Sequence, residues 1–124
     1  LIWSPGDLTP QGSDERPAGH IDLMPTLLGM LGYEKPFFAF GRDLFSAPLS
    51  GRTIHYVGGY KTISDELLYM FNDSEFTGIY KYRNDPLQTE NLAGEFHHDD
   101  DSMMWTKAFI QQYYRYVGQR KYTV

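Results

Sequence analysis

The side chains in this sequence that suit metal or acid–base chemistry lie in a few places. Four histidines are present, His20, His55, His97 and His98, and the last two open the acidic run at 97–101. Imidazoles and carboxylates are common ligands of divalent cations. Adjacent side chains point in different directions from a helix start or turn, so five in a row do not readily close on one ion. We interpret the run as a solvated, acidic helix N-terminus.

His20 and Asp22 form the second candidate, because two residues at the start of a predicted helix could act as a ligand pair or a catalytic dyad. The interpretation we favour is structural: Asp22 caps the helix and His20 packs beside it. His55 lies in a strand-like run between Ile54 and Tyr56, and we expect it on a sheet face. The sequence therefore assigns no catalytic, cofactor-binding or metal-ligating residue to this chain.

Other catalytic signatures are also missing from the sequence. It contains no Cys, which excludes disulfides and thiolate chemistry here, and it has neither a Gly-x-Ser-x-Gly elbow nor a glycine-rich phosphate loop. The carboxylate pairs Asp14-Glu15 and Asp65-Glu66 fall at loop positions. A net charge of -5 disfavours nucleic acid as a partner. No apolar run is long enough to span a bilayer, so we expect no direct membrane contact.

Two helices are predicted, and the first covers residues 21–31. Asp22 is placed to cap its start, Pro25 falls in its first turn, and Gly32 ends it. The second helix follows the acidic run, with Asp99, Asp101 or Ser102 as its cap. The apolar residues of this second helix recur at helical spacing at Trp105, Ala108, Phe109, Tyr113, Tyr116 and Val117.

Between the helices the pattern changes to short β-rich runs, predicted as strands at 53–57, 60–64, 67–71 and 78–82. Turn residues separate them, which favours an antiparallel meander. Its many aromatic residues could form a stacking platform for sugars or bases, but core packing is the simpler interpretation. The aromatic stretch at 33–49 suits an irregular, packed connection. The opening run at 1–6 is typical of a buried strand in a larger sheet.

Two stretches resemble a known family. The segment HIDLMPTLL at 20–28, followed by LGY at 31–33 and FGRDLF at 40–45, resembles the part of sulfatase-family proteins that follows their last metal-ligand motif. The segment GIYKYRNDPLQTENLA at 78–93 resembles their C-terminal signature. The runs KPFFAFGRDLF at 35–45 and FIQQY at 109–113 look most like the bacterial lipoteichoic acid synthase, or phosphoglycerol transferase, branch of this alkaline phosphatase superfamily.

This resemblance implies a metal-dependent parent enzyme in which a Thr, Ser or modified Cys attacks a phosphodiester or sulfate ester, assisted by Mn²⁺ or another divalent ion. It also implies a location on the extracytoplasmic face of a bacterial membrane. In the family's order, all the residues that do this chemistry lie upstream of Leu1. The order Gly19-His20-Ile21-Asp22 does not match the family's Asp-His ligand pair.

We therefore expect an α/β (α+β) fragment with two parts. Residues 1–50 would form the edge of an alkaline-phosphatase-like catalytic domain, and residues 51–124 a small antiparallel sheet packed by a C-terminal helix. The chain would be non-catalytic alone, with the upstream catalytic domain as its partner and self-association if it is detached. Two alternatives stay open: an arylsulfatase parent acting on sulfated glycans, and a module that binds glycans or lipid headgroups.

Overall fold

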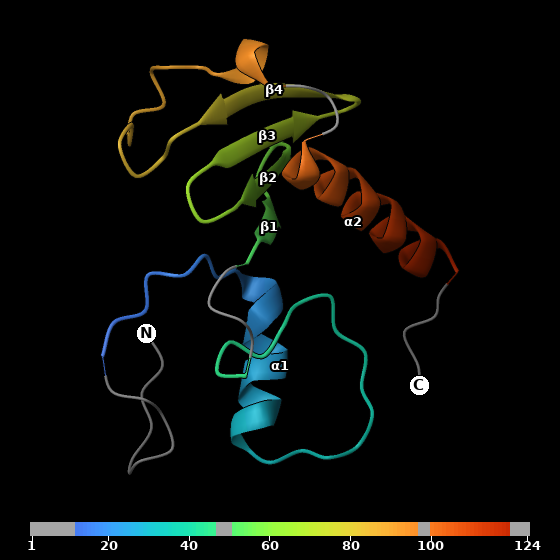
Figure 1. Ribbon diagram of the computed structural model, residues 1–124. Coiled ribbons are helices and arrows are strands. Elements are labelled where there is room, and N and C mark those ends of the chain that lie inside the picture. The colour runs from blue at the N-terminus through green and yellow to red at the C-terminus, as the bar shows by residue number, and fades with distance from the viewer. Residues whose placement is uncertain (1–11, 47–50, 97–99, 120–124) are drawn as a thin grey trace.

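The computed structural model describes residues 12–46, 51–96 and 100–119, which form a mixed α+β structure (Figure 1). This confirms the coarse fold class. The predicted strand at 1–6 and the residues His97, His98 and Asp99 lie outside the described part. The elements are α1 (His20–Met30), β1 (Thr53–Tyr56), β2 (Tyr60–Ile63), β3 (Leu68–Asn72), β4 (Glu75–Tyr80), a 3₁₀ turn η1 (Ala93–Glu95) and α2 (Asp101–Gly118).

The four strands form one antiparallel sheet in the order β1-β2-β3-β4, as the sequence predicts. Gly58 and Asp73 take positive φ angles of 64° and 51° in the first and last hairpin turns. The predicted start of β4 at residue 78 is wrong. The tight turn allows β3 and β4 to pair directly after it, at Asn72 with Glu75. An irregularity between Met70 and Phe71 then shifts the register of the two strands.

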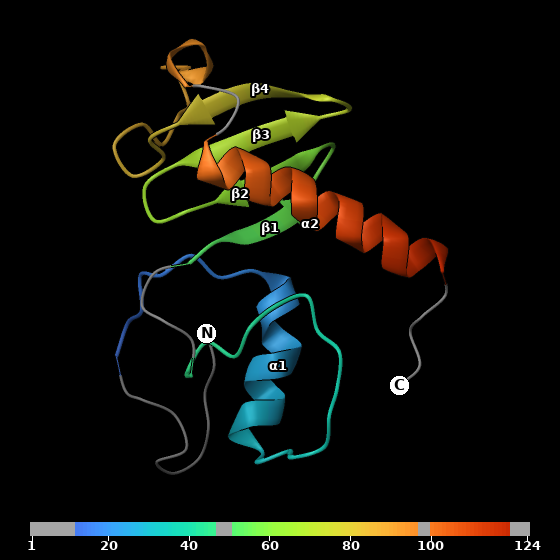
Figure 2. The ribbon, with the colours of Figure 1, turned by 45° about the vertical axis from the view of Figure 1, so that its right-hand side comes forward.

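The hydrophobic core lies between the sheet, the segment that leads into η1 and the start of α2. Tyr69, Ile79, Leu92 and Met103 form one buried cluster, and Ile79 is fully buried. α2 crosses one face of the sheet (Figure 2), where the buried hydroxyls of Thr62 and Thr106 are 2.7 Å apart. We call residues 51–96 and 100–119 the sheet lobe and residues 12–46 the helix lobe. The predicted division into two domains at residue 50 stays a prediction.

The first helix begins one residue earlier than predicted, and Asp22 is not its N-cap. Gly19 occupies that position, and the Asp22 carboxylate reaches back to accept a 2.9 Å hydrogen bond from the Gly19 amide. Asp22 is therefore the third residue of the helix and supplies the carboxylate half of a capping box. The sequence pattern identified the right residue but placed it at the wrong position.

Pro25 also lies deeper in α1 than predicted, in the second turn. Since Pro25 has no N–H, the carbonyl of Ile21 loses its intrahelical donor. Gly41 packs against that carbonyl so closely that an added Cβ would lie 2.0 Å from the oxygen. At the other end the prediction is confirmed: Gly32 has φ 65°, and the Tyr33 amide donates to Leu28 O.

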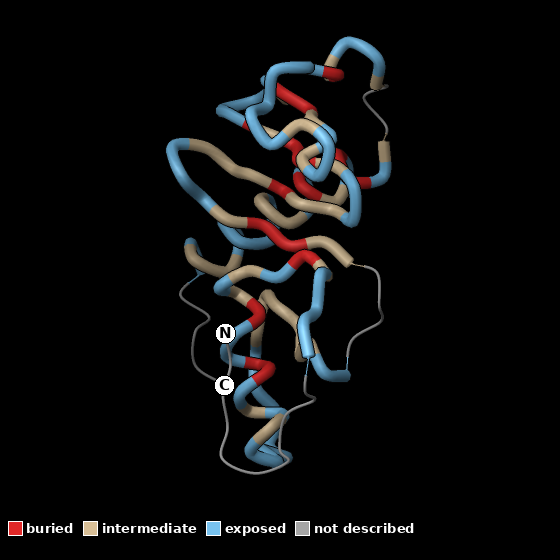
Figure 3. The backbone as a smooth tube through the Cα atoms, turned by 90° about the vertical axis from the view of Figure 1, so that its left-hand side faces the viewer, coloured by how far each residue is buried: buried red, intermediate tan, exposed pale blue. Residues whose placement is uncertain are grey.

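Three apolar side chains on one side of α1 face solvent. The residues that α1 buries are Asp22, Pro25 and Thr26, whereas Leu23, Met24 and Leu27 are 47%, 48% and 40% exposed. The alternation of buried and exposed segments along the helix lobe is visible in Figure 3. The polar side is buried because segment 41–44 bonds to it: Asp22 accepts from the Arg42 amide at 3.0 Å, and Thr26 Oγ1 accepts from the Leu44 amide at 3.0 Å.

The second helix is capped by Asp100, which accepts hydrogen bonds from the amides of Ser102 and Met103. Asp101 and Ser102, two of the predicted caps, are instead its first helical residues. The predicted stripe packs only in part: Phe109 and Tyr116 contact Phe40 of the helix lobe, whereas Ala108 and Tyr113 are exposed. Phe40 lies 5.3 Å from Phe109 between ring centroids, and segment 33–46 is irregular as predicted.

Candidate functional site

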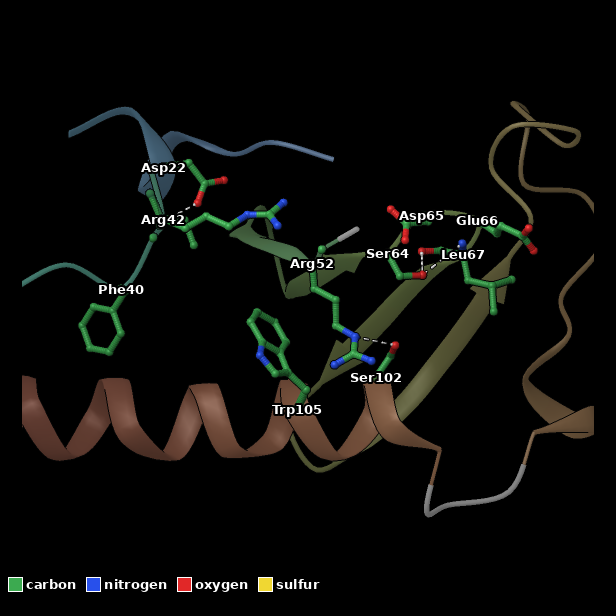
Figure 4. Close-up of a pocket in the computed structure, with 13 residues that line it drawn as sticks. Asp22, Phe40, Arg42, Arg52, Ser64, Asp65, Glu66, Leu67, Ser102 and Trp105 are labelled. Carbon is green, nitrogen blue, oxygen red and sulfur yellow. Dashed lines mark hydrogen bonds between the residues drawn. The ribbon is translucent and has the colours of Figure 1, made fainter. Parts of the chain in front are cut away.

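A cleft of about 680 Å³ lies between the two lobes (Figure 4). Its size falls within the range of small-molecule sites, roughly 300–1,000 Å³. α1 and segment 40–42 form one wall, and the start of the sheet and of α2 form the other. The lining residues are Ile21, Asp22, Phe40, Gly41, Arg42, Gly51, Arg52, Ser64, Asp65, Glu66, Leu67, Ser102 and Trp105.

Arg52 is fixed in this cleft by the first turn of α2. Its Nε donates to Ser102 Oγ at 3.0 Å, and its Nη2 pairs with the Asp101 carboxylate. The Arg52 side chain is 29% exposed. A guanidinium has five N–H donors, so these two contacts leave three with no protein acceptor among the described residues. Arg52 is therefore both positioned and able to bind more.

Arg42 enters the cleft from the opposite lobe. Its backbone amide donates to Asp22, and its Nη2 donates to the carbonyl of Pro17 at 3.0 Å. The guanidinium packs directly on the backbone of Gly51, where any added Cβ would overlap it. The two arginines thus approach one space from different lobes. Ten residues separate them in sequence, and no local pattern predicted this convergence.

The other end of the cleft is acidic. Asp65 and Glu66 form the turn between β2 and β3, which the Ser64 amide closes by donating to Leu67 O at 2.9 Å. Both residues are exposed, and neither carboxylate accepts a hydrogen bond from another described residue. Figure 4 shows them on the side of the cleft away from Arg42. The cleft is therefore polarised: Asp65 and Glu66 make one end acidic, and the other end carries Arg42 and Arg52, with Asp101 paired to Arg52 and the Asp22 carboxylate buried.

The sequence candidates for metal chemistry do not assemble in the described structure. Asp22 is 1% exposed, and its carboxylate accepts from the backbone amides of Gly19 and Arg42, so it has a structural role. His20 is exposed at the start of α1. Within residues 12–46, 51–96 and 100–119, no group of three or more His, Asp or Glu side chains could hold a metal ion. The donor set of this part does not fit a divalent cation.

His20 and His55 do come together, which the sequence did not predict. They line a second, more apolar groove of about 700 Å³ between α1 and β1. Burial, together with the positive charges of Lys61 and His20, holds the pKa of His55 below its ordinary value. The predicted sheet-face position is confirmed, since His55 pairs in register with Lys61 and is half-buried.

The aromatic residues of the meander serve mainly in packing. Tyr69 and Phe71 are 2% and 8% exposed, while Tyr56 is exposed and meets Tyr60 edge-on at 5.1 Å. Buried rings cannot stack on a sugar or base, and this argues against the meander as a ligand platform.

Neither family models nor curated proteins nor solved structures give a match to this chain. In the described part of the chain no helix is both long and apolar enough to cross a membrane.

Proposed function

We propose that this chain is a non-catalytic C-terminal part of a sulfatase-like, metal-dependent phosphoglycerol transferase or ester hydrolase, and that it supports the catalytic domain. Its place in such an enzyme would be extracytoplasmic. The proposal rests on the sequence resemblance at 20–45 and 78–93 and on one structural observation. That observation is the outward-facing apolar side of α1.

This apolar side has the properties of a docking face. Leu23, Met24 and Leu27 are 40–48% exposed on one short helix, and Leu31 at its end is 79% exposed. Large contiguous apolar patches on a protein surface mark interaction sites. The polar side of α1 is already engaged by segment 41–44. The apolar side is therefore available for the catalytic domain that we propose as the partner.

In this proposal the nucleophile and the ligands for Mn²⁺ or a similar ion belong to the catalytic domain, so no step of the reaction is assigned to this chain. The exposed α1 face would also promote self-association of the isolated chain.

Two experiments test the proposal. We expect the gene to encode, upstream of Leu1, a nucleophile motif and an Asp-His ligand pair; a Thr nucleophile would support the transferase, and a Cys or Ser modification motif the arylsulfatase alternative. We expect the 124-residue chain with Mn²⁺ to cleave neither a chromogenic phosphodiester nor an aryl sulfate. Turnover by the purified chain, or an upstream sequence without these motifs, would refute the proposed function.

A further inference from the structure

The polarised cleft between the lobes has the chemistry of a ligand site. Arg52 is held by Ser102 and Asp101, and so its remaining N–H groups are oriented in advance. A guanidinium whose terminal N–H groups are available matches a planar carboxylate, which it can bind through two parallel hydrogen bonds. Pre-positioning reduces the side-chain entropy lost when a ligand binds. This end of the cleft favours an anionic group.

The second arginine strengthens that preference. Arg42 also lines the cleft, where its guanidinium lies against Gly51, the residue before Arg52. The half-buried ring of Trp105 and the ring of Phe40 supply an apolar wall for the body of a ligand.

The opposite end favours a cation. The carboxylates of Asp65 and Glu66 lie at the turn that closes the cleft, exposed and without a described hydrogen-bond partner. They would repel a dianion whose second charge reached them and attract an ammonium group. The charges along the cleft therefore complement a ligand that carries opposite charges at its two ends.

We propose that this cleft binds a small zwitterion, such as an amino acid or short peptide, with its carboxylate on Arg52 and its ammonium group toward Asp65 and Glu66. The site belongs to this chain alone and does not depend on the proposed function. Failure of one leaves the other standing, because binding to the 124-residue chain is measured without any catalytic domain.

The test follows the indole N–H signal of Trp105 in the ¹⁵N-labelled chain, which has two Trp residues; Trp105→Phe assigns the signal. The probes are γ-aminobutyrate, butyrate and glutarate, which share one carboxylate and differ at the other end. We expect γ-aminobutyrate to bind more tightly than butyrate by about threefold, as a partly exposed ion pair allows, and glutarate to bind most weakly.

Variants locate each contact. Arg52→Gln should weaken γ-aminobutyrate binding by about tenfold through the loss of charge-assisted hydrogen bonds. Arg52→Lys, which keeps the charge and the link to α2 but loses the fork, should weaken it in the same direction. Asp65→Asn with Glu66→Gln should abolish the preference over butyrate. Arg115→Gln, on the exposed side of α2 outside the cleft, is the matched control and should bind as the unaltered chain does.

The opposite results are equally clear. No shift of the Trp105 signal at millimolar probe, equal binding of glutarate, or unchanged binding by Arg52→Lys would overturn the proposal. Tighter binding of inorganic phosphate than of butyrate would also overturn it, since the cleft would then be a general oxyanion site.

Discussion

The helix lobe and the sheet lobe bury different kinds of side chain. In the sheet lobe the buried cluster is apolar, with Tyr69 and Ile79 at its centre. In the helix lobe, α1 buries Asp22 and Thr26, which hydrogen-bond to segment 41–44, and exposes its leucines. Hydrophobic burial drives folding roughly in proportion to area, whereas buried hydrogen bonds mainly determine which arrangement is adopted. The sheet lobe therefore has its own source of stability, while α1 leaves Leu23, Met24 and Leu27 exposed.

The largest effect expected is in the sheet lobe. Ile79→Ala removes a fully buried side chain from β4 and should lower the free energy of unfolding by about 4 kcal/mol, the sum of lost burial and the cavity left behind. Denaturant unfolding followed by circular dichroism measures this. A loss below about 1 kcal/mol would mean that the apolar cluster is not the stabilising core.

The second prediction concerns the buried carboxylate of α1. Asp22→Ala leaves the amides of Gly19 and Arg42 without their acceptor and should lower the free energy of unfolding by about 3 kcal/mol. Hydrogen exchange should show α1 losing protection before the sheet does. Asp14→Ala removes an exposed carboxylate that, within the described part of the chain, hydrogen-bonds Arg16 and no residue of α1; it is the control and should leave α1 protected.

A smaller effect is expected where α2 meets the sheet. Thr106 Oγ1 donates to Ser102 O, and so it accepts from Thr62. Thr62→Val should therefore cost about 1 kcal/mol. In a double-mutant cycle, Thr106→Val should cost less in the Thr62→Val background than alone. Additive losses would show that the two hydroxyls are not coupled.

The contact between the lobes can be tested by pH. The folded-state pKa of His55 is lowered by burial, Lys61 and His20, so the folded chain binds this proton more weakly than the unfolded chain. The contribution of His55 to the free energy of unfolding is therefore fully present above the ordinary pKa of 6.5. It is lost as the pH falls through 6.5 and then through the lowered pKa. His20→Gln, which removes the imidazole that the helix lobe contributes, should raise the NMR titration midpoint of His55, and Lys61→Gln, within the sheet lobe, should raise it too. An unchanged midpoint would contradict the assigned cause.

Most of the secondary structure could be predicted because local chemistry determines it. Gly32 ends α1 and the turn residues separate the strands as expected. The predicted N-cap positions differ from the observed ones by one to three residues. The path of the backbone decides whether a residue such as Asp22 or Asp100 is the cap or lies within the helix, and the sequence does not define that path. The outward face of α1 could not be predicted, because helical periodicity identifies an apolar side and says nothing about whether this chain covers it.

The cleft could not be predicted from the sequence. Arg42, Arg52 and Trp105 belong to a loop, the start of a sheet and a helix, and none lies in a local motif. Arg42 falls in the segment at 40–45 that resembles the sulfatase family, but the resemblance assigns it no role. The pair His20 and Asp22 attracted notice by proximity in sequence, but the Asp22 carboxylate bonds to backbone amides.

The docking role of α1 is tested most directly by substituting the side chains on its apolar side. Leu23→Gln with Met24→Gln and Leu27→Gln should change the free energy of unfolding of the 124-residue chain by less than about 1 kcal/mol, because all three side chains are already exposed. In the parent enzyme that we propose, we expect a loss of about 3 kcal/mol or more, since the same side chains would be buried there. Met104→Gln with Leu87→Gln, both exposed outside α1, should have little effect in both. A small change in both proteins would contradict the docking role.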